Sequence, residues 1–332
     1  MKSKWLRRFA VKCAVAVVVV AALAVSLSLR PSPGLRLLCS NNEESCRSVA
    51  DAYSKESGVS VAVTRMPTSQ ALARIESAPG EFDAWLGGPA EAYMLAEHRG
   101  LLEASRPDLS NIPSRFVDPR GYWHGVYAGV LAFCVRDESL TSWADLASLE
   151  WRGRYVLPDP LTSGTAASML QVLAEVSGEN RAKLVEFLKN LDAGALTYTM
   201  SGTSVAHLVA VGAADATVTF APYCKFEKDQ GAPVNVVYPL EGTGYEIGAV
   251  AVLTGAEPIA HDFVSFAVSD SGQRAGIVGS GQQATSLRIE NNIETALAAL
   301  NVEIVQPASA VSGAQREKMT EIWVDEVRRG LV

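Results

Sequence analysis

The chain has 332 residues, of which 48% are apolar and 20% are charged, and its formal net charge at pH 7 is −7. This composition is typical of a globular protein and excludes a disordered or low-complexity chain. The acidic balance, without a basic stripe, argues against nucleic acid as a partner. A chain of about 300 residues beyond a leader is long enough for two modest cores rather than one.

The N-terminus has the pattern of an export signal. Five basic side chains in the first twelve residues precede an uncharged stretch, 13–29, that is rich in Val, Ala and Leu. We expect residues 1–28 to be a signal peptide or, because the apolar run approaches the length of a membrane span, an uncleaved N-terminal anchor. Residues 29–34 form a linker. Removing the leader with its five positive charges takes the net charge from −7 to −12. The protein is expected in the periplasm or another extracytoplasmic space, tethered to the membrane if the leader is retained.

Four cysteines follow the leader: Cys39, Cys46, Cys134 and Cys224. An oxidising compartment permits disulfides between them, and their spacing is not that of a zinc site. Cys39 and Cys46 are close in sequence, but the sequence leaves open whether they pair or remain buried thiols.

The first part of the chain alternates strand and helix signals, which predicts an α/β domain with a mainly parallel sheet. The capping side chains and acidic residues after position 39 mark a helix start. The expected elements are a strand at 35–39, a helix after 40–42 that stops near 58, a strand at 59–63, a helix at 69–75, a strand at 82–86, a turn at 87–89 and a helix at 90–97.

A long apolar segment, 126–135, is expected to cross into a second α/β series, and another, 247–253, to cross back. Two crossings predict two lobes joined by a hinge, with a ligand in the cleft between them. We place lobe 1 at 35–130, lobe 2 at 131–246, and the return to lobe 1 with the C-terminal helices at 247–332.

Seven motifs occur in the order expected of one family. They are Asp83-Ala-Trp-Leu-Gly-Gly-Pro89, Gly100-Leu-Leu-Glu103, Asp118-Pro-Arg-Gly-Tyr-Trp123, Ser142-Trp-Ala-Asp-Leu146, Trp151-Arg-Gly153, Pro158-Asp-Pro-Leu-Thr-Ser-Gly-Thr165 and Glu241-Gly-Thr-Gly-Tyr-Glu-Ile-Gly-Ala249. With them the chain resembles the extracellular solute-binding proteins of ABC importers, in the branch that includes ferric-ion binders and binders of phosphorylated small molecules. The resemblance implies an α/β, two-lobed periplasmic-binding-protein fold of type II. It implies a monomeric binding protein, not an enzyme and without a cofactor, that carries a small solute to an ABC permease.

Three serine- or glycine-bearing turns that lead into helices are the first candidates for ligand binding: Ser40-Asn41-Asn42, Ser163-Gly164-Thr165 and Ser201-Gly202-Thr203. Backbone N–H groups at a positive helix end suit a phosphate, phosphonate or carboxylate, and the hydroxyls add donors. Each turn could instead be only a helix cap. Three of them at equivalent cleft positions of the fold favour a shared anion site.

The resemblance adds Gly87, Gly88, Tyr223, Tyr245 and Glu246 to the candidate ligand-binding residues. Glu246 would accept a hydroxyl or amine of the ligand, or else pair with a nearby arginine at the hinge. Tyr245 would line the cleft, or else belong to the core.

Ferric iron is a second ligand class that the resemblance raises. The iron site of the branch would need a histidine where this chain has Asn42, a glutamate where it has Gly88, and paired tyrosines where Tyr223 stands beside Cys224. One phenolate out of four expected ligands makes iron the weaker alternative, and we predict no metal site.

Two other functions fit the same resemblance less well. A ligand-sensing receptor for a membrane histidine kinase would use the same fold and gains weight if the leader is retained. A secreted phosphate-ester hydrolase is disfavoured, because no nucleophile or metal motif is present. Phosphosugar binders of the branch carry a His-Asp pair where this chain has Pro222-Tyr223, so the sequence names no sugar.

Overall fold

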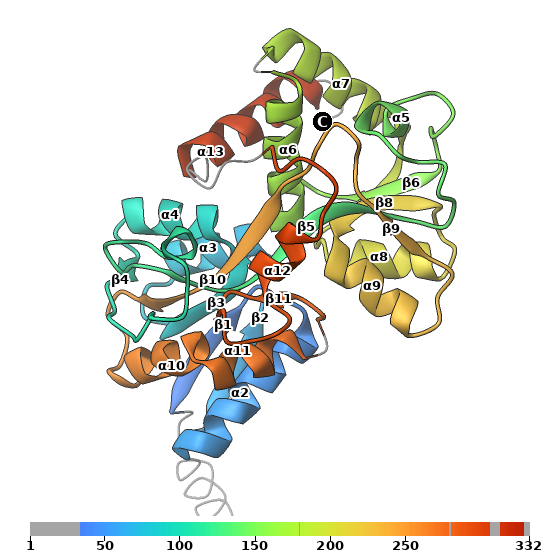
Figure 1. Ribbon diagram of the computed structural model, residues 1–332. Helices are drawn as coiled ribbons and strands as arrows, with labels where there is room; N and C mark the ends of the chain where they lie inside the picture. Colours follow the sequence, from blue (N-terminus) through green and yellow to red (C-terminus); the bar gives the residue numbers. More distant parts are fainter. Residues whose placement is uncertain (1–33, 179, 279, 306–312, 329–332) are drawn as a thin grey trace, which may run out of the picture. The chain divides into compact units, whose positions relative to one another are not determined.

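The computed structural model describes residues 34–178, 180–278, 280–305 and 313–328, and the fold reported is that of the unit Leu35–Val332. Its buried apolar side chains form two separate cores (Figure 1). One core draws on 35–130 and 245–293, and the other on 131–234 and 319–327. The chain therefore has the predicted two-lobed α/β fold. The expected leader, 1–28, lies outside the described residues, and no described helix is long and apolar enough to cross a membrane.

The first lobe is built on a mixed sheet in the strand order β2-β1-β3-β10-β5. The three strands β1 to β3 run parallel, and β10 runs antiparallel to both β3 and β5. The strands are β1 (Leu35–Cys39), β2 (Val61–Arg65), β3 (Ala84–Pro89), β4 (Leu102–Glu103), β5 (His124–Val135), β10 (Tyr245–Leu253) and β11 (Gln283–Ala284). The helices are α2 (Glu43–Ser57), α3 (Thr68–Ser77), α4 (Ala90–His98), α10 (Ile259–Val268), α11 (Asp270–Ile277), α12 (Ile293–Ala298) and the 3-10 turn η1 (Ser114–Phe116).

The second lobe is built on the strand order β5-β8-β6-β7, with β9 also paired to β5. Its strands β6, β7 and β8 are parallel, and β8 is antiparallel to β5. The remaining strands are β6 (Tyr155–Pro158), β7 (Ala195–Thr199), β8 (Ala216–Phe220) and β9 (Asn235–Val237). The helices are α5 (Trp143–Leu146), α6 (Gly164–Val176), α7 (Arg181–Gly194), α8 (Ser204–Ala210) and α9 (Ala221–Asp229).

Strand β5 is the first crossing between the lobes. All twelve of its residues are buried; 124–130 pair with the first sheet and 131–135 with the second. The second crossing precedes β10 and is tied to β5, because the Leu131 backbone N–H donates to the Gly244 carbonyl at 2.8 Å and the Thr243 hydroxyl donates to the Leu131 carbonyl at 2.7 Å. Both crossings run between the lobes in Figure 1.

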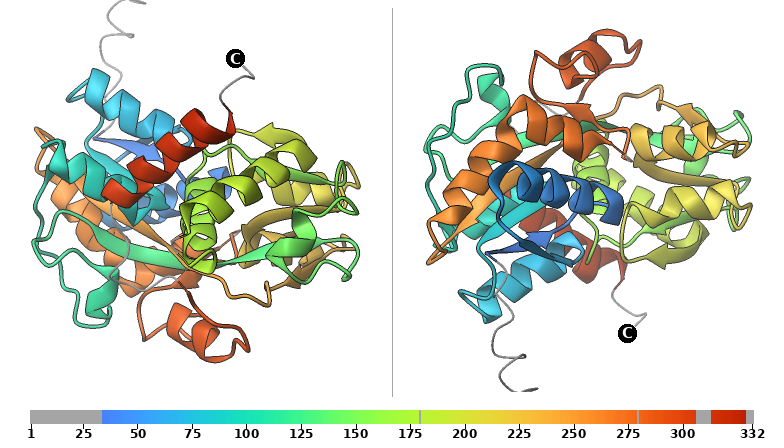
Figure 2. Two further views of the ribbon diagram at one scale, coloured as in Figure 1. Left: turned by 90° about the horizontal axis from the view of Figure 1, so that it is seen from above. Right: turned by 90° about the horizontal axis from the view of Figure 1, so that it is seen from below.

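The C-terminal helix is shared between the lobes. Helix α13 (Gly313–Ile322) contacts α4 of the first lobe and α6 of the second, and lies across both in Figure 2. It continues as a π-helical turn, η3 (Trp323–Val327), whose Trp323 is fully buried in the second core. From the sequence, this segment was expected to belong with the return to lobe 1. The structure differs because its apolar side chains pack against α6 and α7.

The residues Gly87-Gly88-Pro89 were expected to form a turn, but they are the end of strand β3. Gly88 has φ +79°, and a Cβ there would lie 2.7 Å from the Thr68 hydroxyl oxygen. Glycine lets this strand end approach α3 without breaking its pairing with β10.

Both possible disulfides that the sequence left open are formed. Cys39 at the end of β1 is bonded to Cys46 in α2, and Cys134 in β5 is bonded to Cys224 in α9. Each bond therefore fastens a helix to a strand within one lobe.

Candidate functional site

The carboxyl ends of three parallel strands, β1, β2 and β3, meet at one edge of the first lobe. Ser40 follows β1, Arg65 ends β2 and Pro89 ends β3, and all three line one cavity. This edge is where open α/β sheets bind ligands. The second lobe closes the opposite wall with the turns before α6 and α8 and with Tyr223 of α9.

Most of the predicted binding residues lie in this cavity. They are Ser40, Gly88, Ser163, Gly164, Thr165, Ser201, Gly202, Thr203, Tyr223 and Glu246. Segments as far apart as residues 40 and 246 are thus brought together.

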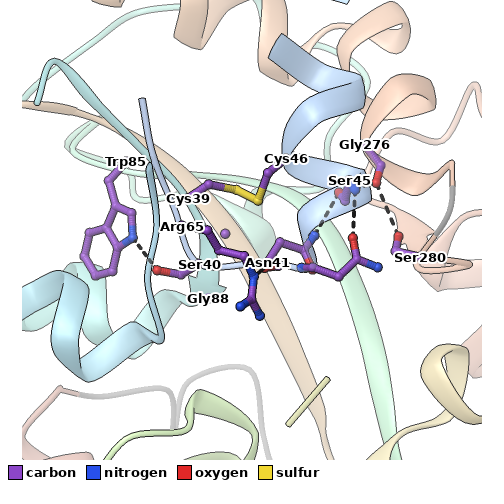
Figure 3. Close-up of a disulfide and its surroundings, with 12 residues drawn as sticks. Cys39, Ser40, Asn41, Ser45, Cys46, Arg65, Trp85, Gly88, Gly276 and Ser280 are labelled. Atoms are coloured by element: carbon purple, nitrogen blue, oxygen red, sulfur yellow. Dashed lines mark hydrogen bonds between the residues drawn. A yellow bond between two sulfur atoms is a disulfide. The ribbon is translucent and has the colours of Figure 1, made fainter. Parts of the chain in front are cut away.

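The first turn is held rigidly from behind. The Cys39–Cys46 disulfide lies directly behind Ser40 and Asn41 (Figure 3), and Trp85 Nε1 donates to the Ser40 hydroxyl at 2.9 Å. Asn41 Nδ2 donates to the Ser45 hydroxyl at 3.0 Å. These bonds fix the backbone that enters α2.

Arg65 lines the cavity and is a candidate ligand-binding side chain that was not predicted from the sequence. Its Nε donates to the Asn41 carbonyl at 2.7 Å, and its Nη2 lies 3.2 Å from Thr203 Oγ1 and 3.4 Å from Ser201 Oγ across the cleft. The hydrogen bond of Nε holds the guanidinium in place, while Nη2 points across the cleft. A guanidinium held in this way is suited to bind an oxyanion. The position of Arg65 at the carboxyl end of β2, a strand parallel to β1, is the signal from which Arg65 could have been predicted.

The turn before α6 combines a cap with a buried hydroxyl. Ser163 is the N-cap, and its Oγ accepts from the Ala166 N–H at 3.4 Å. Thr165 is 6% exposed, and a Cβ added to Gly202 would lie 1.9 Å from its Oγ1. The two turns of the second lobe therefore touch at Thr165 and Gly202, which only a glycine permits.

The turn before α8 presents two hydroxyls to Arg65. Ser201 Oγ and Thr203 Oγ1 are 2.9 Å apart, and Thr203 precedes α8 without making a side-chain cap. The Ser201 hydroxyl oxygen also accepts from the Thr203 N–H at 3.3 Å, and both residues line the cavity.

A hydrogen-bonded triangle joins the lobes beside the cavity. The Tyr223 hydroxyl of the second lobe donates to Asn41 Oδ1 at 3.1 Å and accepts from Gln282 Nε2 at 3.0 Å, while Asn41 Nδ2 donates to Gln282 Oε1 at 2.9 Å. Asn41 thus acts in holding the lobes together and does not itself line the cavity.

Glu246 lines the cavity floor and is 5% exposed. Burial raises the pKa of Glu246 to about 8, with a further increase from the neighbouring Glu91 carboxylate and an opposing effect of Arg316. Its carboxyl group makes no hydrogen bond or ion pair within 4 Å to any described residue.

Besides Asn41, three predicted residues are not brought to the cavity wall. The Asn42 side chain caps α2 by accepting from the Ser45 N–H at 2.7 Å. Gly87 lies behind Asn41, where a Cβ would be 3.0 Å from its backbone nitrogen. Tyr245 lies on the other face of β10 from Glu246, with its ring 6.2 Å from that of Phe116, because successive strand residues point to opposite faces.

The cavity is small. Its volume is about 20 Å³, which is room for about one water molecule. Among residues 34–178, 180–278, 280–305 and 313–328, no group of three or more His, Cys, Asp or Glu side chains is placed to hold a metal ion. The wall offers one guanidinium, one carboxyl group and several hydroxyl groups, and the guanidinium and hydroxyls can donate hydrogen bonds to an oxyanion.

Comparisons with known proteins cover most of the chain. The sequence profile of the bacterial extracellular solute-binding proteins matches residues 35–276. An uncharacterized protein of Haemophilus influenzae is 31% identical over 333 residues, covering 93% of this chain and 94% of that protein.

Two solved structures extend the comparison. The periplasmic binding protein AfuA from Actinobacillus pleuropneumoniae, solved with exogenous fructose-6-phosphate bound, is 30% identical, with a TM-score of 0.79 over 89% of this chain and 98% of AfuA. Iron-bound HitA from Pseudomonas aeruginosa shares the fold at 18% identity, with a TM-score of 0.74 over 88% of this chain and 98% of HitA.

Proposed function

Because the chain belongs to the bacterial extracellular solute-binding proteins, we propose that it captures a small organic anion between its lobes and delivers it to an ABC permease. The anion carries a phosphate, phosphonate or carboxylate group. The protein acts outside the cytoplasmic membrane as a monomer, and residues 1–28 direct its export or tether it there.

The observation that carries the proposal is Arg65 facing Ser201 and Thr203 across the cavity, at 3.4 and 3.2 Å. A guanidinium and hydroxyls drawn from opposite lobes supply donors from two sides. Charge-assisted hydrogen bonds of this kind are about twice as strong as neutral ones. An oxyanion placed between them would bind both lobes and so favour the closed form.

The N-terminal end of α6 adds a further contribution. This helix has thirteen residues, and its first turn carries Gly164 and Thr165 at the cavity. Its unpaired N–H groups and positive end favour an anion. The phosphate ester bound by AfuA, the 30% identical relative, supports a phosphate ester as the first ligand class to test.

Iron is the less well supported ligand. The described cavity wall holds one phenol, Tyr223, and one carboxyl group, Glu246. The phenol is engaged with Asn41 and Gln282. Ferric ion needs a cluster of hard anionic donors, which these two side chains do not make.

The first experiment is a thermal-shift screen with phosphate esters, phosphonates, carboxylates and ferric citrate. A ligand that binds only the folded state raises the melting temperature by mass action. We expect stabilisation by organic anions. A response to ferric citrate alone, with a tyrosinate-to-iron absorption band, would contradict the proposal.

The second experiment replaces hydroxyl donors without changing shape. Thr165→Val and Thr203→Val each remove one hydrogen bond to a charged group, which is worth about 1.5 to 3 kcal/mol, or roughly tenfold to a hundredfold in affinity. Titration calorimetry with the best ligand of the screen measures the loss, and melting without ligand serves as the folding control. If both variants bind like the parent, these turns are helix caps only.

Arg65 gives the matched charge test. Arg65→Gln should weaken binding at least as much as either threonine variant, since it removes the cation. Arg47→Gln on the exposed surface of α2, where Arg47 pairs with Glu43 and does not line the cavity, removes the same charge and is the control. Equal effects of the two arginine changes would point to long-range charge and not to a binding site.

A further inference from the structure

The carboxyl group of Glu246 is an unexpected component of a site that binds an anion. Its carboxyl group is on the cavity wall with Ser201, Thr203 and Arg65, and only 5% of the residue is exposed. An ionised carboxylate at this place would repel the anion that Arg65 attracts. It would also be buried without a hydrogen bond or ion pair to any described residue, which is the costly state for a charge.

The ionisable groups around Glu246 come from five other elements, and two of these groups are guanidiniums. They are Glu91 and Tyr93 on α4, Tyr127 on β5, Tyr223 on α9, Arg65 on β2 and Arg316 on α13. The nearer influences on its charge are the second carboxylate, Glu91, and the guanidinium of Arg316. Neither lies within ion-pair distance of Glu246.

We propose that Glu246 meets the bound solute as a neutral carboxylic acid that donates its O–H to a solute oxygen, and that Arg316 sets the pH at which this donor is lost. The proposal rests on the proposed anion-binding function and deepens it. The protonation state of Glu246 determines how tightly the solute binds. A protonated carboxyl group can donate a hydrogen bond to the anion, whereas an ionised carboxylate repels it.

Arg316 reaches this position from outside the part of the chain that the family profile matches. It lies on α13, is 7% exposed, and its Nη2 is 3.4 Å from the Ser69 hydroxyl. Its Nη1 and Glu91 Oε2 are buried without a hydrogen-bond partner among the described residues. A desolvated guanidinium near two carboxyl groups stabilises their ionised forms, and burial in turn lowers the pKa of Arg316. Arg316 is therefore a positioning residue that acts on the solute through Glu246.

The first test needs no ligand. The carboxyl carbons of ¹³C-labelled glutamates are followed by NMR from pH 4 to 10, and the resonance that disappears in Glu246→Gln assigns Glu246. We expect its midpoint near pH 8, a higher midpoint in Arg316→Met, and a return toward the parent value in Arg316→Lys. A midpoint in the ordinary range of an exposed glutamate, about 4 to 5, would overturn the proposal.

The second test follows binding of fructose 6-phosphate by calorimetry between pH 7 and 9. A phosphate monoester keeps nearly constant charge there, since its second pKa is about 6. If only the neutral form of Glu246 binds, affinity in the parent falls about tenfold from pH 7 to pH 9. Glu246→Gln should lose this dependence and bind more tightly than the parent at pH 9. Arg316→Met should move the fall to higher pH, which a purely structural role would not do.

The outcomes separate the two proposals. Binding that is independent of pH in the parent overturns the role of Glu246 while leaving the anion-binding function in place. If fructose 6-phosphate does not bind at any pH, the phosphate-ester form of the proposed function fails, and the NMR midpoint still decides whether Glu246 is neutral.

Discussion

His124 is a buried imidazole at the start of β5, and its ring makes one hydrogen bond to a described side chain. Its Nε2 lies 2.8 Å from the Ser105 hydroxyl oxygen, and its Nδ1 has no partner among the described residues. Burial lowers the pKa of His124 to about 4 from 6.5, outweighing the opposite effect of Asp118. Between about pH 6.5 and pH 4, His124 is therefore neutral in the folded state and protonated in the unfolded chain.

This shift predicts acid sensitivity at residue scale. Because the unfolded state binds a proton below pH 6.5 and the folded state does not, stability is retained above pH 6.5 and lost as the pH falls toward 4, by up to about 3 kcal/mol. Urea denaturation at pH 7 and pH 5 measures the loss, and His124→Gln should reduce it. Protonation of Glu246 stabilises the folded state as the pH falls through this range, which opposes the effect of His124. The loss of stability between pH 7 and pH 5 is therefore compared between the parent and His124→Gln. Equal losses in both would contradict the prediction.

The candidate site was only partly predictable from its residues. The turns at 40–42, 163–165 and 201–203 were identified because cap and glycine signals are local in sequence. Arg65 was not identified, because an arginine at the end of a strand has the same local sequence pattern whether it faces a cleft or the solvent. The pairing of Asn41 with Tyr223 and Gln282 joins positions more than 180 and 240 residues from Asn41, and no local signal carries that information.

The disulfides act at the scale of elements, and each holds a segment that reaches the cleft. Cys39 precedes the Ser40-Asn41 turn, and Cys224 follows Tyr223 directly. The first bond closes a loop with a sequence separation of 7 and the second one of 90. Loop-closure entropy makes the longer loop the more stabilising, at about 4 to 5 kcal/mol against about 2 to 2.5 kcal/mol.

We therefore expect the two double variants to differ. Cys134→Ala with Cys224→Ala should lower the free energy of unfolding by more than Cys39→Ala with Cys46→Ala, as measured by urea denaturation. Alanine avoids burying new hydroxyls at sites that are fully buried. Comparison with the reduced parent protein shows whether the loss comes from the bond or from the side chain. A larger loss for the shorter loop would contradict the entropic argument.

Long and strongly apolar elements were predicted better than short ones. The expected strand at 35–39 has those bounds in the structure, and the two long apolar segments expected at 126–135 and 247–253 are the strands β5 and β10, each of which begins two residues earlier. The second crossing itself precedes β10. Strand β7 was not predicted, because its residues are half exposed and lack a buried run. The three-residue β9 is too short to leave a periodic signal.

At the scale of the molecule, the lobes are in a closed arrangement. Arg65 reaches Thr203, Tyr223 reaches Asn41, and the Ser69 N–H donates to the Thr162 carbonyl at 3.4 Å. A cavity of about 20 Å³ admits no organic solute. Entry of a solute into this cavity therefore requires the lobes to separate about β5 and the segment before β10. Under the proposed function, the solute then replaces part of the contact between Arg65 and the two hydroxyls.

Gly164 provides a way to block this closure without altering either lobe. It is the first residue of α6, and a Cβ there would lie 2.4 Å from Pro89 Cδ and 2.9 Å from Pro89 Cγ in the facing lobe. Alanine is accepted by the helix itself, where it is favoured over glycine by about 1 kcal/mol. Gly164→Ala should therefore fold normally and fail to close fully. An overpacking cost of about 1 to 3 kcal/mol corresponds to a loss of affinity of roughly five- to 150-fold.

The measurements are calorimetry and small-angle X-ray scattering with and without fructose 6-phosphate. The parent should become more compact on binding, and Gly164→Ala should show less compaction and weaker affinity at an unchanged melting temperature without ligand. Pro89→Ala removes the two atoms that the new methyl group would meet, so the double variant should bind more tightly than Gly164→Ala alone. Such non-additivity identifies the contact between the lobes as the cause. Full compaction and parent-like affinity in Gly164→Ala would mean that the solute is bound without the closure described by this structure.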